Sequence, residues 1–298
     1  MKKNIIFYVL LLSVLLVACG KDENLEPSNL GKDWFVVEDD VNDLVTHAIY
    51  QFYKETGIPV FYNDTIGRET RVDNWGNSYT YYETLSVNYA LGGVAEAGGR
   101  PSVSSYVLCP KEYVLDGLEF LKTDVIPVIP ENVGVRSFLL LDSLTSWGFG
   151  YEAFKGLNTI LVSRMTKLNG MSEKARKSLR GAVIRSILSV SVLAYEDELA
   201  TFYKITRNHY TTEDLYGYNA WYFTSRTPYD DPKEVGFLDK NPRNMAILPT
   251  ESMDVNMYLE AIFSNTESEF MELYGAYEPI MKKYEIIKSI LQDIGVSI

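Results

Sequence analysis

The chain has 298 residues and a formal net charge of −12 at pH 7; 46% of its residues are hydrophobic and 23% are charged. This length and composition are typical of a globular protein with a well-buried core. The acidic balance argues against nucleic-acid binding and against electrostatic attachment to anionic lipid. We therefore expect no nucleic-acid partner, and membrane attachment requires a lipid group.

The N-terminus predicts a secretory leader. Two lysines precede an apolar run over residues 5–17, which is too short to span a bilayer. The run ends in Leu-Val-Ala-Cys at positions 16–19, which looks like a bacterial lipobox, a cleavage site whose cysteine thiol receives a diacylglycerol. We predict that residues 1–18 are removed as a lipoprotein signal peptide and that Cys19 becomes the lipidated N-terminus.

A surface-export signal follows the predicted lipidation site. Lys21, Asp22 and Glu23 resemble the lysine and acidic residues that direct lipoproteins of Bacteroidetes-type bacteria to the outer face of the outer membrane. Proline, serine and glycine then occur among acidic residues, as in flexible linkers. The sequence predicts an outer-membrane protein that faces the cell exterior, with residues 19–33 as a lipidated tether and residues 34–298 as a single domain.

The N-terminal half of the domain predicts strands mixed with helices. Apolar residues recur at helical spacing over residues 41–53, and Gly57 is a natural stop. Residues 58–62 predict a strand, and the aromatic segment 75–89 predicts a hairpin or a further strand. Glycines in residues 92–99 predict a loop that lacks the pattern of a phosphate-binding turn. A helix and two strands complete this half, at residues 110–122, 136–141 and 158–163.

The C-terminal half predicts mostly helices. Ser172 caps a long helix whose middle, residues 182–193, is apolar on nearly every side, which indicates a central buried helix. A polar, aromatic-rich connection covers residues 206–244, and helices through residues 255–263 and 280–291 follow. Because strands come early and helices late, the predicted class is α+β.

The order of these elements resembles one protein family. The resemblance rests on a helix that leads into residues 57–62 (GIPVFY), a buried helix followed by residues 202–206 (FYKIT), the pair at 236–237 (GF), and two terminal helices. These features are similar to the substrate import-associated zinc metallohydrolase lipoproteins, a metallopeptidase family that Bacteroidetes encode beside TonB-dependent nutrient importers. The resemblance implies a zincin-like fold, with the TonB-dependent transporter and its lid lipoprotein as partners.

The metal-binding motif of that family is missing here. The family carries His-Glu-x-x-His on its buried helix, where two histidines one turn apart bind zinc and the glutamate activates water. In this chain the motif falls on residues 186–190, and Ser186, Ile187 and Val190 occupy the positions of its functional residues. The resemblance therefore implies the fold but no catalytic residue, no metal and no cofactor.

Other potential ligands are equally sparse. The chain contains only two histidines, His47 and His209, which lie too far apart for a two-histidine site on one helix. The later acidic residue of the family site falls near Met257, with Asp254 and Glu260 close by. The sequence therefore predicts a pseudo-metallopeptidase rather than an enzyme.

Aromatic residues provide the remaining candidates. The chain has 22 tyrosines and 4 tryptophans, and rings in predicted hairpin or loop segments suit contacts with sugars, peptides or a partner protein. Tyrosine and tryptophan are also often packed under loops, which is the simpler explanation for about half of them. The candidate ligand-binding residues are Trp75, Tyr81, Tyr82, Trp221, Tyr222 and His209.

Three functions remain open at this point. The first is a catalytically inactive accessory or binding subunit of a TonB-dependent (Sus-like) import system for peptides or glycans. The alternative is a hydrolase, either peptidase or glycosidase, with a relocated site of carboxylates and His209; convergence of His209 with two acids would favour it. The third is a purely structural subunit without a ligand.

Overall fold

A computed structural model of the protein describes residues 32–88, 102–147 and 151–296. One compact unit covers Phe35–Ile298 and is mixed α+β, about 49% helical and 16% strand, with the strands in its N-terminal part and a helical C-terminal half. The predicted class is confirmed at this level. The predictions for Cys19, Lys21, Asp22, Glu23 and the loop at residues 92–99 lie outside the described residues.

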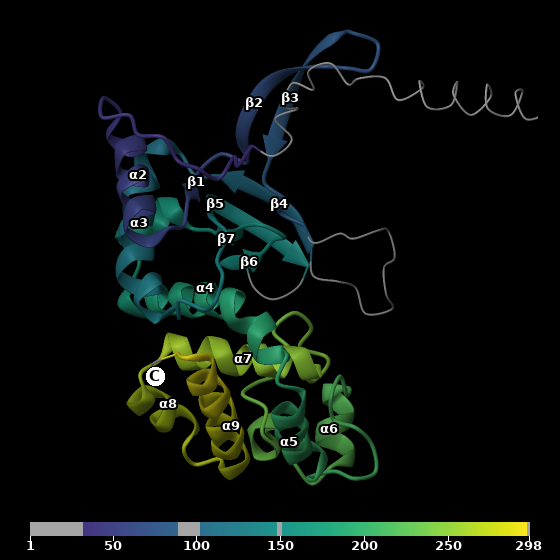
Figure 1. Ribbon diagram of the computed structural model, residues 1–298. Coiled ribbons are helices and arrows are strands. Elements are labelled where there is room, and N and C mark those ends of the chain that lie inside the picture. Colours follow the sequence, from purple (N-terminus) through teal and green to yellow (C-terminus); the bar gives the residue numbers. More distant parts are fainter. Residues whose placement is uncertain (1–31, 89–101, 148–150, 297–298) are drawn as a thin grey trace, which may run out of the picture. The chain divides into compact units, whose positions relative to one another are not determined.

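A five-stranded sheet forms around one long central strand (Figure 1). β5 (Phe138–Trp147) begins with a run of four fully buried apolar residues, where it pairs in parallel with β1 (Val60–Phe61) and β7 (Ile160–Val162). Its second half pairs antiparallel with β4 (Ser102–Leu108). β6 (Ala153–Lys155) pairs antiparallel with β7 and ends the strand order β1-β5-β7-β6.

A separate antiparallel hairpin stands apart from this sheet (Figure 1). It consists of β2 (Thr65–Val72) and β3 (Ser78–Thr84), joined by a turn in which the Asp73 carboxylate accepts hydrogen bonds from the backbone N–H groups of Trp75 and Asn77. β3 confirms a strand in the aromatic segment 75–89. Its partner β2 precedes that segment and was not predicted.

Two helices, which contact each other, lie to one side of β1 in the N-terminal half (Figure 1). α2 (Leu44–Thr56) begins after Asp43, whose carboxylate accepts from two backbone N–H groups of the first turn, and ends at Gly57 with φ of +72°. α3 (Val114–Phe120) continues into a wider π turn over Leu121–Val125. Both helices confirm the sequence predictions.

The helical half is built on α4 (Glu173–Leu193), which lies between the sheet and the later helices (Figure 1). Ser172 caps α4 as predicted: its side chain accepts a hydrogen bond from the Ala175 N–H. The helices that follow are α5 (Glu196–Arg207), α6 (Ala220–Arg226), α7 (Glu251–Ser264), α8 (Glu267–Tyr274) and α9 (Glu278–Ile294).

Among the described residues, no single helix has the length and apolarity needed to cross a membrane. Only α4 and α5 taken together meet these criteria, and they are bent by 104° at their junction.

The predicted connection over residues 206–244 needs correction. It contains α6, which begins after Asn219 because the Asn219 side chain accepts hydrogen bonds from the backbone N–H groups of Trp221 and Tyr222. Trp221 and Tyr222 therefore lie on a helix rather than in a loop. A seven-residue helix gives too short a periodic pattern to be recognised in an aromatic-rich segment.

α4 and α7 are in close contact at Gly181. A Cβ atom placed on Gly181 would lie 2.0 Å from Oγ of Ser264 and 2.6 Å from the carbonyl oxygen of Glu260. Next to this contact the Arg180 side chain donates from Nε to the carbonyl oxygen of Phe263, at 2.8 Å. The lack of a side chain at Gly181 thus permits the helix pairing on which the pocket described below is built.

We predict that Gly181→Ala destabilises the protein by about 1–3 kcal/mol, because the new methyl group overlaps backbone atoms that cannot move aside without shifting α7. Gly170→Ala is the matched control, since a Cβ at Gly170 meets nothing within 4 Å, and it should change the stability by no more than about 0.5 kcal/mol. Urea unfolding followed by circular dichroism measures both. Equal stabilities of the two variants would contradict the close contact.

Candidate functional site

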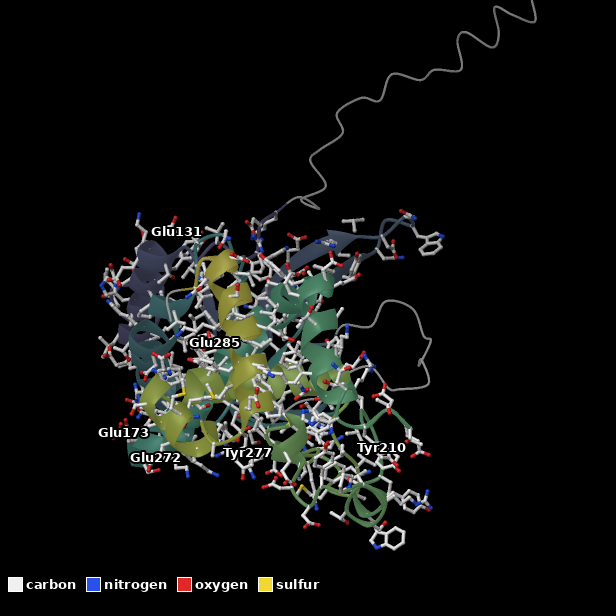
Figure 2. The ribbon with its side chains drawn as sticks, turned by 90° about the horizontal axis from the view of Figure 1, so that it is seen from below. Glu131, Glu173, Tyr210, Glu272, Tyr277 and Glu285 are labelled. Carbon is white, nitrogen blue, oxygen red and sulfur yellow. The ribbon has the colours of Figure 1, made fainter. Side chains whose placement is uncertain are left out.

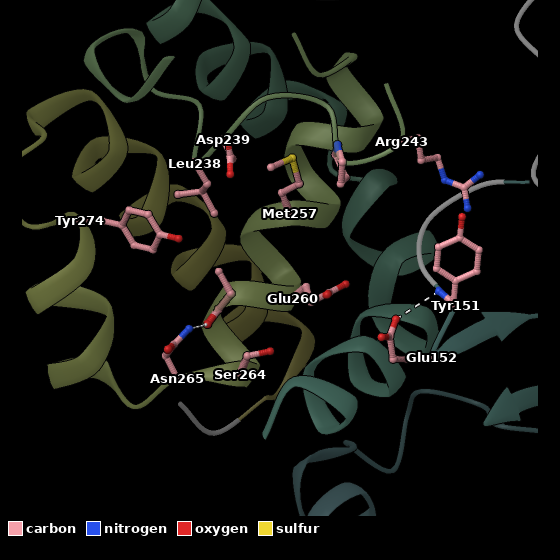
Figure 3. Close-up of a pocket in the computed structure, with 12 residues that line it drawn as sticks. Tyr151, Glu152, Leu238, Asp239, Arg243, Met257, Glu260, Ser264, Asn265 and Tyr274 are labelled. Carbon is pink, nitrogen blue, oxygen red and sulfur yellow. Dashed lines mark hydrogen bonds between the residues drawn. The ribbon is translucent and has the colours of Figure 1, made fainter. Parts of the chain in front are cut away.

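A pocket of about 470 Å³ opens where α7 meets the segment that precedes β6 (Figure 3). Four of its lining residues, Met257, Glu260, Ala261 and Ser264, follow the i, i+3, i+4, i+7 spacing that places side chains on one face of α7. The remaining lining residues are Tyr151, Glu152, Leu238, Asp239, Pro242, Arg243, Asn265 and Tyr274.

An ion pair joins α4 to the pocket wall. Nε of Arg185 lies 2.9 Å from Oε2 of Glu260, and the Arg185 side chain is only 5% exposed. Burial raises the pKa of the Glu260 carboxyl, with Arg185 acting in the opposite direction and the nearby Glu152 in the same one. Burial likewise lowers the pKa of Arg185, against the effect of Glu260. Each group therefore depends on the other for its charge.

A second arginine neutralises the acid on the opposite wall. Nη2 of Arg164 lies 2.6 Å from Oε1 of Glu152, whose other oxygen accepts a hydrogen bond from the Tyr151 N–H at 3.1 Å. Arg164 has φ of +67°, a left-handed conformation that is uncommon for residues other than glycine. Its backbone N–H donates to the carbonyl of Asp142, which holds this turn against β5.

The third side of the pocket is a loop between η5 (Pro232–Val235) and α7. The buried Asn241 holds its turn, because its side-chain oxygen accepts from the backbone N–H groups of Arg243 and Asn244, at 2.9 and 3.2 Å. Nη2 of Arg243 donates to the carbonyl oxygen of Ser146, at 2.8 Å. The loop thus presents the Arg243 side chain at the pocket edge, beside Tyr151 (Figure 3).

The residues at the degenerate motif are not gathered at the pocket. Ser186 is buried and donates to the Ala182 carbonyl, Ile187 belongs to the hydrophobic core, and Val190 is 61% exposed. Instead, the preceding residue, Arg185, contacts the pocket wall through Glu260. The only sequence feature that could have indicated this contact is that Arg185 is the single charged residue in the apolar run 182–193.

The acidic positions near Met257 have different roles. Glu260 lines the pocket, whereas Asp254 is fully buried away from it and pairs with Lys283, whose Nζ lies 2.6 Å from its carboxylate. The described residues contain no group of three or more His, Cys, Asp or Glu side chains arranged to hold a metal ion. With Arg185 at its wall, the pocket has the chemistry of a binding site for polar or charged groups.

His209 does not join a carboxylate site in the described part of the chain. It follows α5, and its Nδ1 lies 3.3 Å from the Tyr229 hydroxyl. Burial lowers its pKa, as do the charges of Lys282 and Lys283. His209 is absent from the pocket lining, so a relocated site that combines it with two acids is not favoured.

The aromatic candidates divide between two other surfaces. On the hairpin, Trp75 is 85% exposed at the turn and Tyr82 is exposed on β3, whereas Tyr81 is half-buried under the Arg71 guanidinium and donates to Glu83. On α6, Trp221 is 68% exposed and contacts Tyr222 with the two rings tilted by 58°, while Arg226 covers the Tyr222 ring. None of these rings lines the pocket. The aromatic candidates therefore did not predict the position of the pocket.

The outer surface of the protein is rich in carboxylates. Figure 2 labels four exposed glutamates, which come from separate segments: Glu131, Glu173, Glu272 and Glu285. Tyr210 and Tyr277 lie at other points of the same view. These four acids are exposed, whereas Glu152 and Glu260 in the pocket are only partly exposed and are paired with arginines.

Comparison of the chain with models of protein families, with curated proteins and with solved structures finds no match.

We predict that Glu260 reduces stability progressively as the pH rises above its ordinary pKa of 4.5. A folded-state pKa above the unfolded value means that the folded protein binds the proton more tightly. The unfolding free energy of the wild type should therefore fall relative to that of Glu260→Gln between pH 4.5 and pH 7.

Urea unfolding at several pH values measures this difference. Glu272→Gln, on the exposed surface of α8, is the control and should leave the pH profile of the wild type unchanged. If the unfolding free energy of the wild type instead rises relative to that of Glu260→Gln as the pH increases, the prediction is wrong. The ion pair with Arg185, rather than burial, would then determine the pKa of Glu260.

Proposed function

We propose that this protein is a surface-exposed, lipid-anchored lipoprotein of the outer membrane whose zincin-like domain binds a ligand without hydrolysing it. Its role is that of an accessory or binding subunit of a TonB-dependent (Sus-like) import system for peptides or glycans. The observation that carries the proposal is the Arg185–Glu260 ion pair, which brings a guanidinium from the buried helix to an acidic residue of a later helix at the wall of a pocket.

Several features support a zincin-derived origin. The buried helix α4 contacts the terminal strand β6 of the sheet. α7 supplies an acid next to α4, and the resemblance implies such an acid on a later helix. In a metallopeptidase the zinc ion neutralises such an acid. In this chain the side chain of Arg185 provides the positive charge, while the positions aligned with the metal motif hold Ser186, Ile187 and Val190.

We predict that the purified protein, expressed from Gly20 onward, contains no zinc in a one-to-one ratio and shows no chelator-sensitive peptidase activity. The described residues contain no group of three His, Cys, Asp or Glu side chains arranged to hold a metal ion, and Glu260 already pairs with Arg185 at 2.9 Å. Elemental analysis and a fluorogenic peptide assay, each with and without a chelator, provide the measurements. Stoichiometric zinc together with peptide cleavage that the chelator abolishes would refute the proposal.

The membrane and partner parts of the proposal are tested through the predicted lipid anchor. We expect the wild type to fractionate with the outer membrane and to co-purify with a TonB-dependent transporter and its lid lipoprotein, and we expect Cys19→Ala to leave the membrane fraction. If Cys19→Ala loses the membrane but keeps the transporter, the protein is a true subunit. If both are lost, it is a tethered binder, and membrane retention of Cys19→Ala would contradict lipidation at this residue.

One observation favours a second candidate, a glycoside hydrolase. Glu152 and Glu260 line the same pocket in different surroundings, and a pair of carboxylates is the usual machinery for glycoside cleavage. Each carboxylate is held in an ion pair by an arginine, Glu152 at 2.6 Å and Glu260 at 2.9 Å, so neither faces the pocket without a partner. This alternative would be established if the wild type releases reducing sugar from glycans and Glu260→Gln abolishes that release.

A further inference from the structure

Arg243 differs from the other arginines around the pocket. Arg164 and Arg185 are neutralised by Glu152 and Glu260, at 2.6 and 2.9 Å. Arg243 forms no ion pair within the described residues, and one of its five N–H groups donates to the Ser146 carbonyl. The pocket lining therefore contains one cation whose charge no neighbouring carboxylate neutralises.

The position of this cation is fixed before any ligand arrives. The Asn241 side chain holds the backbone of Arg243, and the Asn241 N–H donates to the Ile247 carbonyl at 3.1 Å, which closes the loop. The bond from Arg243 to Ser146 then anchors the guanidinium to the end of β5. A guanidinium held in this way loses little conformational freedom when an anion binds, and its planar donors match a carboxylate.

An acid lies at the other side of the pocket. Asp239 is exposed beside Tyr274, and its side chain accepts only the backbone N–H of Lys240, at 2.6 Å, among the hydrogen bonds of the described residues. Figure 3 shows Arg243 and Tyr151 at one side, Asp239 and Tyr274 at the other, and Met257 between them. Opposite charges thus stand on either side of the Met257 side chain.

This arrangement identifies a class of ligand. We propose that the pocket binds a short peptide with free termini, with its C-terminal carboxylate at Arg243, its N-terminal ammonium toward Asp239 and an apolar side chain against Met257. The inference rests on the proposed function, in which the pocket is a binding site, and adds the nature of the ligand. An acidic glycan offers a carboxylate to Arg243 but no cation to Asp239, and the pocket volume of about 470 Å³ lies within the range of small-molecule sites.

The test titrates leucine peptides into the protein expressed from Gly20 onward, which retains the whole compact unit Phe35–Ile298. Calorimetry compares dileucine, trileucine and tetraleucine, and the tightest binder is then tested with its C-terminus amidated or its N-terminus acetylated. We expect C-terminal amidation to weaken binding to the wild type by about tenfold or more, since it removes a charge-assisted hydrogen-bonded pair. N-terminal acetylation should also weaken binding, because it removes the ammonium charge that faces Asp239.

Variants assign each peptide terminus to its residue. Arg243→Ala should bind the free peptide about as weakly as the wild type binds the amidated one, and amidation should then have no further effect. Asp239→Asn should behave in the same way toward acetylation. Arg68→Ala removes an exposed arginine from the hairpin, outside the pocket, and should leave every affinity unchanged.

Three results would overturn the inference: no binding of any free peptide, equal affinity for the free and amidated peptides, or tight binding of trigalacturonate that Arg243→Ala abolishes. The last result would make the ligand an acidic glycan and would leave the proposed binding function standing. Zinc-dependent peptidase activity would instead overturn that function. If Arg243→Ala fails to fold, the comparison of free with amidated peptide on the wild type still decides the outcome.

Discussion

The close approach of α4 and α7 is the constraint on which the pocket depends. Gly181 allows the two helix backbones to meet at Glu260 and Ser264, because any side chain at this position would overlap them. Arg185 follows Gly181 by four residues and therefore lies on the same face of α4. The glycine that brings the helices together thus also brings the guanidinium within 2.9 Å of the Glu260 carboxylate.

A second buried pair fixes the other side of α7. The Lys283 ammonium on α9 lies 2.6 Å from the Asp254 carboxylate, and neither side chain is exposed to solvent. Tyr216 donates to the same carboxylate oxygen at 3.0 Å, and the rings of Phe202 and Phe237 surround the ammonium at 4.4 and 5.0 Å. Burial raises the pKa of Asp254 and lowers that of Lys283, so each charge is maintained by the other.

Such a pair contributes more to geometry than to net stability. Removing one partner of a buried ion pair costs about 3–5 kcal/mol, although the intact pair contributes little compared with well-packed apolar residues. Here the pair sets the register of α9 against α7 and ties both to the segment that contains Tyr216 and Phe237. The same segment continues into the loop that carries Asp239 and Arg243, so the buried charges also support the pocket wall.

The periodicity of the sequence predicts the long helices, whereas the short strands are defined by pairing with distant parts of the chain. α2, α4, α7 and α9 extend over several turns with an apolar face or an apolar middle, and such patterns are visible in the sequence. β6 has three residues and the buried part of β5 has four, so their roles in the sheet depend on the partners they pair with. A three-residue strand leaves too few positions to show an alternation.

The pocket was harder to predict than the fold because helical phase decides which acid faces it. Asp254 and Glu260 are six residues apart on α7, and at about 100° per residue their side chains point in directions about 120° apart. One therefore meets Lys283 in the core while the other meets Arg185 at the pocket. Arg185 and Glu260 are separated by 75 residues, so no local pattern connects them.

The ion pair between α4 and α7 also explains how the pocket wall accommodates an acid. The Glu260 side chain is 28% exposed, and a partly buried carboxylate is destabilised relative to one in water unless a compensating charge or a proton neutralises it. Arg185 on α4 supplies the charge that compensates Glu260 on α7, at 2.9 Å. Because Arg185 and Glu260 lie on two helices that pack against each other, their pairing supports the shape of the pocket wall. Under the proposed function, ligand recognition then depends on the positive charge that is not neutralised by an ion pair within the described pocket lining, which is that of Arg243.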